Sequence, residues 1–270
     1  MIKIEFYNVK EKIFQGQSQY IVYSSPIVTG FVSPLKGKKQ MIDWSKLTLQ
    51  QIITRIRANF KRSSRRSKSV IYDIARSNTW EWFITLTFDP EKVNSFDYDE
   101  CSKGLKNWLD RVRRKCDGDL KYIIIPELHK SGRYHFHGLL SGAYGLEFVD
   151  SGHETNGDII YNIGSYKLGF TTATQVKDTN RVSMYIAKYV TKELTACTKG
   201  KKRYWASRNC EKPVVNQGYI EKAEHTDLHF NLVNQPDFQF AQEKEKTSPD
   251  GKVGYIRYYE FQENMEEMKA

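Results

Sequence analysis

The histidine pair His135 and His137 is the feature of this sequence best suited to chemistry. The two residues flank Phe136 in the segment RYHFHGLL, residues 133–140, which we predict to be a β-strand. Alternate side chains of a strand project to the same face, so both imidazoles point one way while Phe136 points toward a core. The pair therefore offers two converging metal ligands. The alternative is that the two histidines face solvent on an exposed strand.

A carboxylate can join the histidines from the preceding strand. The stretch YIIIPE, residues 122–127, is a predicted strand that ends at Glu127, and a turn at residues 130–132 connects it to residues 133–140 as a hairpin. The Glu127 carboxylate can then reach across the hairpin to the histidines. Two imidazoles and one carboxylate with open coordination positions suit a divalent ion such as Mn²⁺ or Mg²⁺, with room left for a substrate.

Two tyrosines lie on a later segment, RVSMYIAKYVTKEL, residues 181–194. At about 100° per residue, helical spacing gathers two phenols and two ammonium groups on one more exposed face. These are Tyr185, Lys188, Tyr189 and Lys192. A separate apolar stripe would pack the helix, formed by Val182, Ile186, Val190 and Leu194.

A tyrosine hydroxyl is a legitimate covalent nucleophile, but it needs help. With a reference pKa near 10, only about one phenol in a thousand is ionised at pH 7, which costs roughly 4 kcal/mol. A neighbouring lysine and a metal-bound phosphate would both offset that cost. The alternative is that Tyr185 and Tyr189 are ordinary packing residues at i and i+4.

The charge of the chain favours a polyanionic partner. The 270 residues include 42 Lys and Arg against 32 Asp and Glu, a formal net charge of +10. Seven of these basic residues, and no acid, fall in RIRANFKRSSRRSK, residues 55–68. The four cysteines lack zinc-type spacing, and we find neither a signal peptide nor an apolar run long enough for a bilayer. We therefore expect a cytoplasmic protein with free thiols and no membrane partner.

The elements that must position these residues follow from hydrophobic periodicity and turn signals. Helical spacing predicts helical structure over residues 43–77, 97–114 and 179–194. β-type composition predicts strands at residues 82–88, 122–127, 133–140 and around 169–176, with a loop over 141–157. This order predicts an α+β fold, in which helices flank a central antiparallel sheet that carries the metal ligands.

Three segments in this order resemble the motifs of the HUH endonucleases: FITLTF (83–88), PELHKSGRYHFHGLL (126–140) and YIAKYVTK (185–192). The HUH motif is His, a bulky hydrophobic residue and His, and the motif of the two-tyrosine initiators is close to YxxKY. More narrowly, the chain resembles the rolling-circle replication initiators of small single-stranded DNA phages, plasmids and prophages. The resemblance covers about residues 80–210 and implies a palm of the RRM or ferredoxin-like type.

The resemblance also suggests how the chain is divided. We expect an N-terminal extension with a basic helical segment at residues 1–77 and an HUH-like endonuclease domain at residues 78–236. Residues 237–270 are expected to form a polar C-terminal tail.

The resemblance implies a single divalent metal ion, Mg or Mn, that polarises the scissile phosphate. Its expected ligands are His135, His137 and a third residue. Glu127 matches that third ligand by position, and His129, two residues further on, is the alternative.

In the same family a tyrosine attacks the phosphate, which gives a 5′-phosphotyrosyl enzyme and a free 3′-OH. The ester energy is retained, so the nick can later be resealed. Two tyrosines would allow one cut at the origin and a second cut that terminates replication. Tyr185, three residues before Lys188, is the better-supported nucleophile, Tyr189 is the second, and which one cuts first stays open.

The expected DNA-binding residues fall into three groups. The first motif implies that Thr85 and Thr87 lie near the site. Basic residues of 55–68 and 199–203 would neutralise phosphates, and Tyr204 and Trp205 would stack on unpaired bases. For residues 55–68 the alternative is a solvated helix face. The residues singled out for DNA binding are Thr85, Thr87, Arg62, Arg65, Arg66, Lys192, Arg203 and Trp205.

The sequence thus predicts an enzyme that nicks and rejoins single-stranded DNA to start and terminate rolling-circle replication of a phage or plasmid in the cytoplasm of a bacterial host. Its partners would be single-stranded DNA or an origin hairpin. Because no GxxxxGK[ST] motif occurs, we also expect a host helicase and DNA polymerase. The alternatives are a two-tyrosine transposase, a relaxase, or a non-catalytic basic DNA-binding protein. Against relaxases, the tyrosine of many of them precedes the histidine motif.

Overall fold

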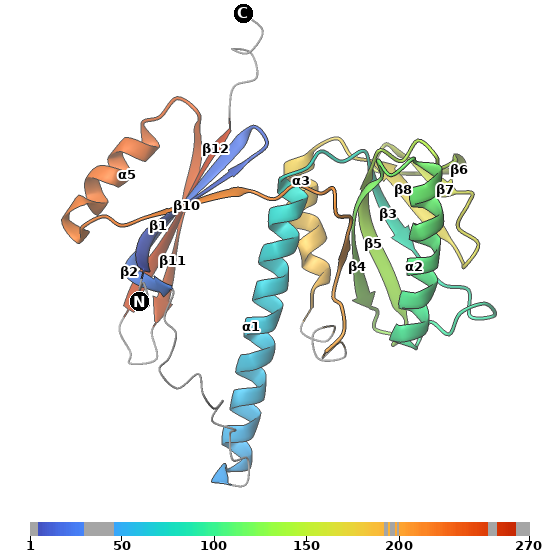
Figure 1. Ribbon diagram of the computed structural model, residues 1–270, viewed down its shortest axis with the longest axis horizontal. Coiled ribbons are helices and arrows are strands. Elements are labelled where there is room, and N and C mark those ends of the chain that lie inside the picture. The colour runs from blue at the N-terminus through green and yellow to red at the C-terminus, as the bar shows by residue number, and fades with distance from the viewer. Residues whose placement is uncertain are drawn as a thin grey trace, which may run out of the picture. The chain divides into compact units, whose positions relative to one another are not determined.

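The structure is a computed structural model that describes residues 5–29, 46–191, 194, 198, 200–247 and 253–262. Contacts within the chain divide it into two units, one of residues 46–212 and one that joins residues 1–45 to residues 213–270 (Figure 1). None of the described helices is long and apolar enough to cross a membrane.

In the described part of residues 46–212, an antiparallel sheet has seven strands in the order β6-β7-β8-β3-β5-β4-β9. The strands are β3 (Trp82–Leu86), β4 (Lys121–Leu128), β5 (Tyr134–Ser141), β6 (Phe148–Thr155), β7 (Asp158–Ile163), β8 (Thr171–Gln175) and β9 (Trp205–Ala206). The sequence prediction of strands at 82–88, 122–127, 133–140 and around 169–176 is confirmed, and β4 and β5 pair as the expected hairpin.

Helix α2 (Tyr98–Lys115) covers one face of this sheet. It begins where the Asp97 side chain accepts hydrogen bonds from the first free backbone amides, and it ends in three basic residues that complement the helix dipole. Its apolar stripe, which includes Leu105 and Trp108, packs on Ile84 and Phe136 of the sheet in one buried cluster. The central strands are therefore fixed from this side.

The other face is covered by α1 (Leu49–Arg76), α3 (Thr179–Ile186) and the 3-10 turn η2 (Ala187–Tyr189). Ile71 and Ile74 of α1 and Ile186 of α3 pack on Ile125 and its neighbours in the sheet. Every buried residue of α1 lies at or after Ser64. The first part of α1, which carries much of the basic charge, has only exposed or half-buried side chains.

Two local expectations for this unit are wrong. Residues 148–155 form strand β6 rather than a loop; nearly every side chain of β6 is exposed, so the segment lacks the apolar alternation that marks a strand. The helix expected over 179–194 ends at Ile186, and after η2 the backbone of Val190 leaves the helical region, with ψ of 78°. The apolar stripe is consequently split: Val190 packs in the α1 cluster and Leu194 in the α2 cluster.

The second unit contains an antiparallel sheet in the order β10-β1-β2-β12-β11. Its strands are β1 (Glu5–Phe14), β2 (Gln17–Thr29), β10 (Val214–Gly218), β11 (Phe238–Thr247) and β12 (Val253–Gln262), accompanied by η3 (Lys222–Glu224) and α5 (His225–Val233). Strand β2 pairs with β12, which brings the two ends of the chain into one sheet.

This pairing differs from the division into residues 1–77, 78–236 and 237–270. Residues 238–247 and 253–262 are strands rather than a polar tail, and β1 and β2 belong with them and not with α1. The difference arises because partners such as Val22 and Arg257 are far apart in sequence, so no local pattern records their pairing.

Candidate functional site

The sheet register places His135, His137 and Glu127 on the face covered by α3 and η2. Glu127 of β4 lies opposite His135 of β5, and Thr85 of β3 lies opposite His137. Because side chains alternate along a strand, His137 shares this face with Leu139, which packs in the α1 and α3 cluster. Phe136 points to the other face and into the α2 core, as the sequence predicted.

The His137 ring is held at both nitrogens and is buried, at 8% exposure. Its Nε2 lies 2.7 Å from Glu127 Oε2 and its Nδ1 lies 3.1 Å from Thr85 Oγ1. An ionised carboxylate only accepts hydrogen bonds, so Nε2–H donates to Glu127 and Nδ1 accepts from the Thr85 hydroxyl. The hydrogen bond from His137 lowers the pKa of Glu127. The pair therefore consists of a carboxylate and a ring of fixed orientation.

His135 is half-buried next to this pair, and its ring centroid lies 5.3 Å from that of His129. Burial lowers the pKa of His135, and the neighbouring His129 and His137 lower it further. A histidine with a lowered pKa is neutral at pH 7, and a neutral imidazole has the lone pair that a metal ligand needs.

Imidazole nitrogens and a carboxylate oxygen are donors that fit a divalent cation such as Mn²⁺ or Mg²⁺. As they stand, no three His, Cys, Asp or Glu side chains in the described residues are grouped closely enough to hold an ion. Nε2 of His137 is occupied by its hydrogen bond to Glu127, so coordination through Nε2 requires that hydrogen bond to be replaced. The alternative ligand His129 is exposed, and its Nδ1 lies 3.0 Å from Ser131 Oγ.

The two tyrosines lie directly over this pair. The Tyr189 ring stacks on the His137 ring, with centroids 3.7 Å apart and planes within 13°. The Tyr189 hydroxyl donates a hydrogen bond of 3.0 Å to the Tyr185 hydroxyl. Phe83 of β3 supports both tyrosines, with ring centroids 5.6 Å and 6.5 Å from theirs. The helix and the histidine strand are thereby joined through one aromatic cluster.

The environments of the two phenols differ. Tyr185 is 43% exposed, and the Lys188 ammonium lies 4.8 Å from its ring centroid. Tyr189 is half-buried, and burial, followed by its hydrogen bond to Tyr185, raises its pKa above the usual range. Tyr189 therefore stays protonated and acts as a hydrogen-bond donor, whereas the oxygen of Tyr185 is the acceptor and is accessible.

The second threonine of the first motif has a structural contact. Thr87 Oγ1 donates to the Phe170 carbonyl at 2.9 Å and accepts from its amide at 3.2 Å. A Cβ on Gly169 would collide with the Thr87 carbonyl oxygen, so only glycine permits this close approach. The Phe170 ring is left 80% exposed. It borders a cavity of about 210 Å³ that His135 and Arg133 also line.

Sequence reasoning missed Phe170 and Arg133. An exposed ring beside the histidines depends on the pairing of β3 with β8, and no motif in the sequence signals it.

The structure separates the remaining expected DNA-binding residues from the tyrosines. Arg62, Arg65 and Arg66 are exposed on α1, and Arg62 donates to Asn59 at 2.6 Å. Arg203 donates to Ser63 of α1 and to Thr198. Lys192 lies outside the described residues.

Trp205 does not present a free ring for base stacking. It lies in β9 on the α2 side of the sheet, with its ring 5.3 Å from that of Phe136 and 6.3 Å from that of Tyr98. The expected stacking of Trp205 on bases is therefore at odds with its packing.

Residues 81–194 match a family model for replication-associated proteins of the ORF2 type. The match covers less than half of the 270-residue chain and includes the strands and the helix that carry the histidines and tyrosines. No curated protein matches, and no solved structure matches. In this segment the chain is thus similar to a family of rolling-circle replication initiators, which supports a role in DNA replication.

Proposed function

We propose that this protein nicks and rejoins single-stranded DNA at an origin and so starts and terminates rolling-circle replication. The observation that carries the proposal is the stacking of Tyr189 on His137, with the Tyr185 hydroxyl hydrogen-bonded to Tyr189. Two phenols next to a histidine and carboxylate pair match the needs of tyrosine transesterification. The similarity of residues 81–194 to replication-associated proteins supports the same reaction class.

Tyr185 is the proposed first nucleophile. Its oxygen is exposed and attacks the scissile phosphorus, so that a P–O bond to tyrosine forms and the bond to the 3′ oxygen breaks. The phenol loses one proton and the departing 3′ oxygen gains one, and the products are a 5′-phosphotyrosine and a free 3′-OH. No water is consumed, so attack by a 3′-OH reverses the step and seals the strand. The hydrogen bond from Tyr189 stabilises the negative charge that develops on the Tyr185 oxygen.

A divalent ion, Mg²⁺ or Mn²⁺, would polarise the phosphate when bound. His135, His137 and Glu127 would hold it, and the 2.7 Å contact of Glu127 with His137 favours Glu127 over His129 as the third ligand. Thr85 orients His137 through its Nδ1. The protein would act with a host helicase and DNA polymerase in the cytoplasm of a bacterial cell.

The experiment incubates the full chain and Mn²⁺ with a pool of single-stranded oligonucleotides that have randomised centres. A covalent adduct that survives denaturing electrophoresis is expected, together with free 3′-OH ends. The matched variant Tyr185→Phe plus Tyr189→Phe keeps both rings and should form no adduct. An absent wild-type adduct, or an equal adduct with the double variant, would refute the enzymatic proposal and leave a non-catalytic DNA-binding protein. A transposase or relaxase shares this chemistry, and the family similarity favours replication.

A further inference from the structure

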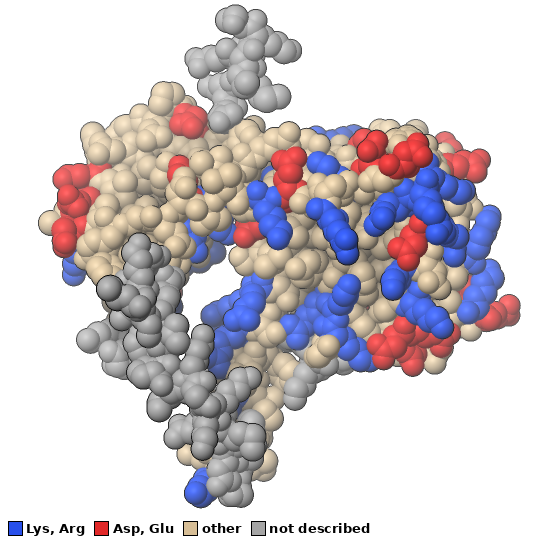
Figure 2. All heavy atoms as spheres, viewed as in Figure 1, with Lys and Arg blue, Asp and Glu red and all other residues tan. Residues whose placement is uncertain are grey.

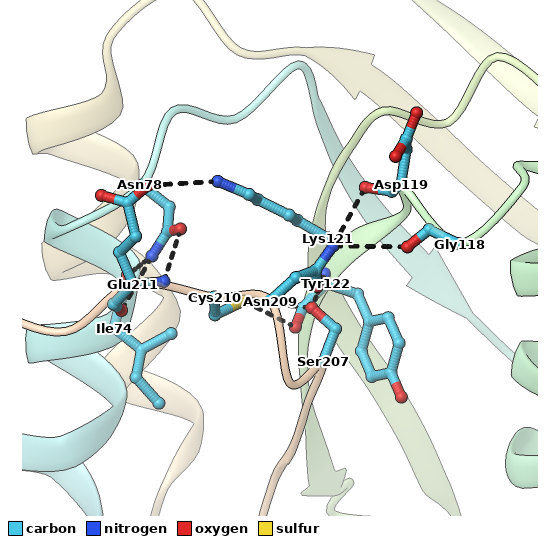
Figure 3. Close-up of polar contacts among 10 residues, drawn as sticks. All are labelled: Ile74, Asn78, Gly118, Asp119, Lys121, Tyr122, Ser207, Asn209, Cys210 and Glu211. Atoms are coloured by element: carbon cyan, nitrogen blue, oxygen red, sulfur yellow. Dashed lines mark hydrogen bonds and ion pairs between the residues drawn. The ribbon is translucent and has the colours of Figure 1, made fainter.

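The chain that follows β9 is fastened on both sides (Figure 3). Toward the sheet, the amide of Ser207 donates to the Tyr122 carbonyl at 3.0 Å, and the Tyr122 amide donates to Ser207 Oγ at 3.0 Å. Asn209 donates to backbone carbonyls of the turn before β4. Toward α1, Asn78 exchanges two hydrogen bonds with the backbone of Glu211, of 3.0 Å and 3.1 Å. This segment is thus a fixed wall.

The fixed wall borders a groove of about 1100 Å³ along the β9 edge of the sheet. Its lining includes five exposed cations, drawn from α2 and from the chain on either side of β9: Lys106, Arg113, Lys202, Arg208 and Lys212. Among the described residues, none of these five forms an ion pair, and Asp110 is the one acid in the lining. In the space-filling view, Lys and Arg side chains gather over the region of α2 and of this segment (Figure 2). Unpaired cations in a groove attract a polyanion.

The groove offers no ready platform for unpaired bases. Single-strand binders combine a basic groove with aromatic rings on which bases stack. Here the Trp205 ring packs against Phe136 and Tyr98, and Tyr122 and Tyr204 pack against the two buried clusters of the sheet. Contacts in this groove therefore favour phosphates over bases, as in backbone binding to a duplex.

The groove is also distinct from the tyrosine site. Its lining includes neither tyrosine of α3 and η2, nor any of the proposed metal ligands. Lys106 and Arg113 come from α2, which covers the face of the sheet opposite to His135 and His137. A bound duplex would thus leave the nicking site accessible to an adjoining single strand.

We propose that this groove binds the phosphate backbone of double-stranded DNA, such as the stem next to a nick site. The proposal rests on the nicking function for its biological setting, but the binding itself can be measured alone. Each phosphate contact contributes about 0.9 to the slope of log K against log salt concentration for duplex DNA. Removing three contacts should lower that slope by about 2.7, equivalent to a loss of roughly 500-fold in affinity at 0.1 M salt relative to 1 M.

The test compares the full chain with the triple variant Arg113→Gln, Arg208→Gln and Lys212→Gln. Binding to a fluorescent duplex of about 20 base pairs is followed by anisotropy at several salt concentrations. The control removes equal charge from exposed lysines outside the groove, with Lys177→Gln, Lys222→Gln and Lys244→Gln. The groove variant should lose duplex affinity and salt slope, and the control should not.

Nicking of an unstructured single-stranded oligonucleotide should be the same for the groove variant and wild type. Equal duplex affinity and slope for the two triple variants would overturn the proposal. An equal loss of duplex and single-strand binding in the groove variant would also overturn it, because the groove would then serve single strands. If wild type nicks nothing, the nicking function fails, while the duplex measurement still decides the role of the groove.

Discussion

Replacing Tyr189 with Phe removes one oxygen atom and keeps the ring that stacks on His137 at 3.7 Å. The substitution therefore removes one interaction, the hydrogen bond of 3.0 Å from the Tyr189 hydroxyl to the Tyr185 hydroxyl. Burial raises the pKa of Tyr189, so this donor remains protonated while charge develops on Tyr185. A hydrogen bond to a charged group contributes about 1.5–3 kcal/mol, and each 1.36 kcal/mol changes a rate tenfold. We expect adduct formation by Tyr189→Phe to be about 10- to 100-fold slower than by wild type.

The assay is single-turnover adduct formation with excess enzyme, Mn²⁺ and a single-stranded oligonucleotide selected from the randomised pool. Tyr185→Phe should form no adduct in the same time, and DNA affinity should be similar for both variants. A rate for Tyr189→Phe within about twofold of wild type would show that the hydrogen bond does not assist the reaction. Loss of the adduct in Tyr189→Phe, with retention in Tyr185→Phe, would reverse the proposed roles.

Three further substitutions test the surroundings of the site. Glu127→Gln removes a carboxylate whose pKa is lowered in the folded chain, so wild type should be more stable by about 1–2 kcal/mol at neutral pH, and urea unfolding should show this advantage vanishing as pH falls through that lowered pKa. Phe170→Ala removes an 80% exposed ring, so single-strand affinity should fall by about 1–3 kcal/mol in titrations without a change in unfolding midpoint; an unchanged affinity would exclude stacking there. Gly138→Ala would place a Cβ 2.7 Å from Ile124 Cγ1 and should destabilise the chain by about 1–3 kcal/mol in urea, whereas an unchanged midpoint would mean that the strands yield.

The parts of the site that sequence patterns predicted are those set by short-range geometry. Period-two alternation put His135 and His137 on one face and Phe136 in the core. Helical spacing brought Tyr185 and Tyr189 together, although the helix ends between them, because a 3-10 turn continues the same face. Motif order then indicated which strands lie under the helix.

The parts that sequence patterns did not predict depend on pairing at long range. Trp205 looked like a ring for base stacking, but β9 pairs with β4 and turns that ring into the α2 core. The exposure of Phe170 depends on the hydrogen bonds of Thr87 across two strands. The sheet built from both ends of the chain has no local signal, since each strand there shows a pattern that many partners would satisfy.

The most direct test of the central claim is to identify the residue that carries the DNA. Trypsin cleaves after Arg181, Lys188 and Lys192, so Tyr185 and Tyr189 fall on separate peptides, VSMYIAK and YVTK. After nuclease digestion of the wild-type adduct, mass spectrometry should find a 5′-phosphonucleotide on Tyr185. A nucleotide on any residue other than the two tyrosines, or on no residue, would contradict tyrosine transesterification at this site.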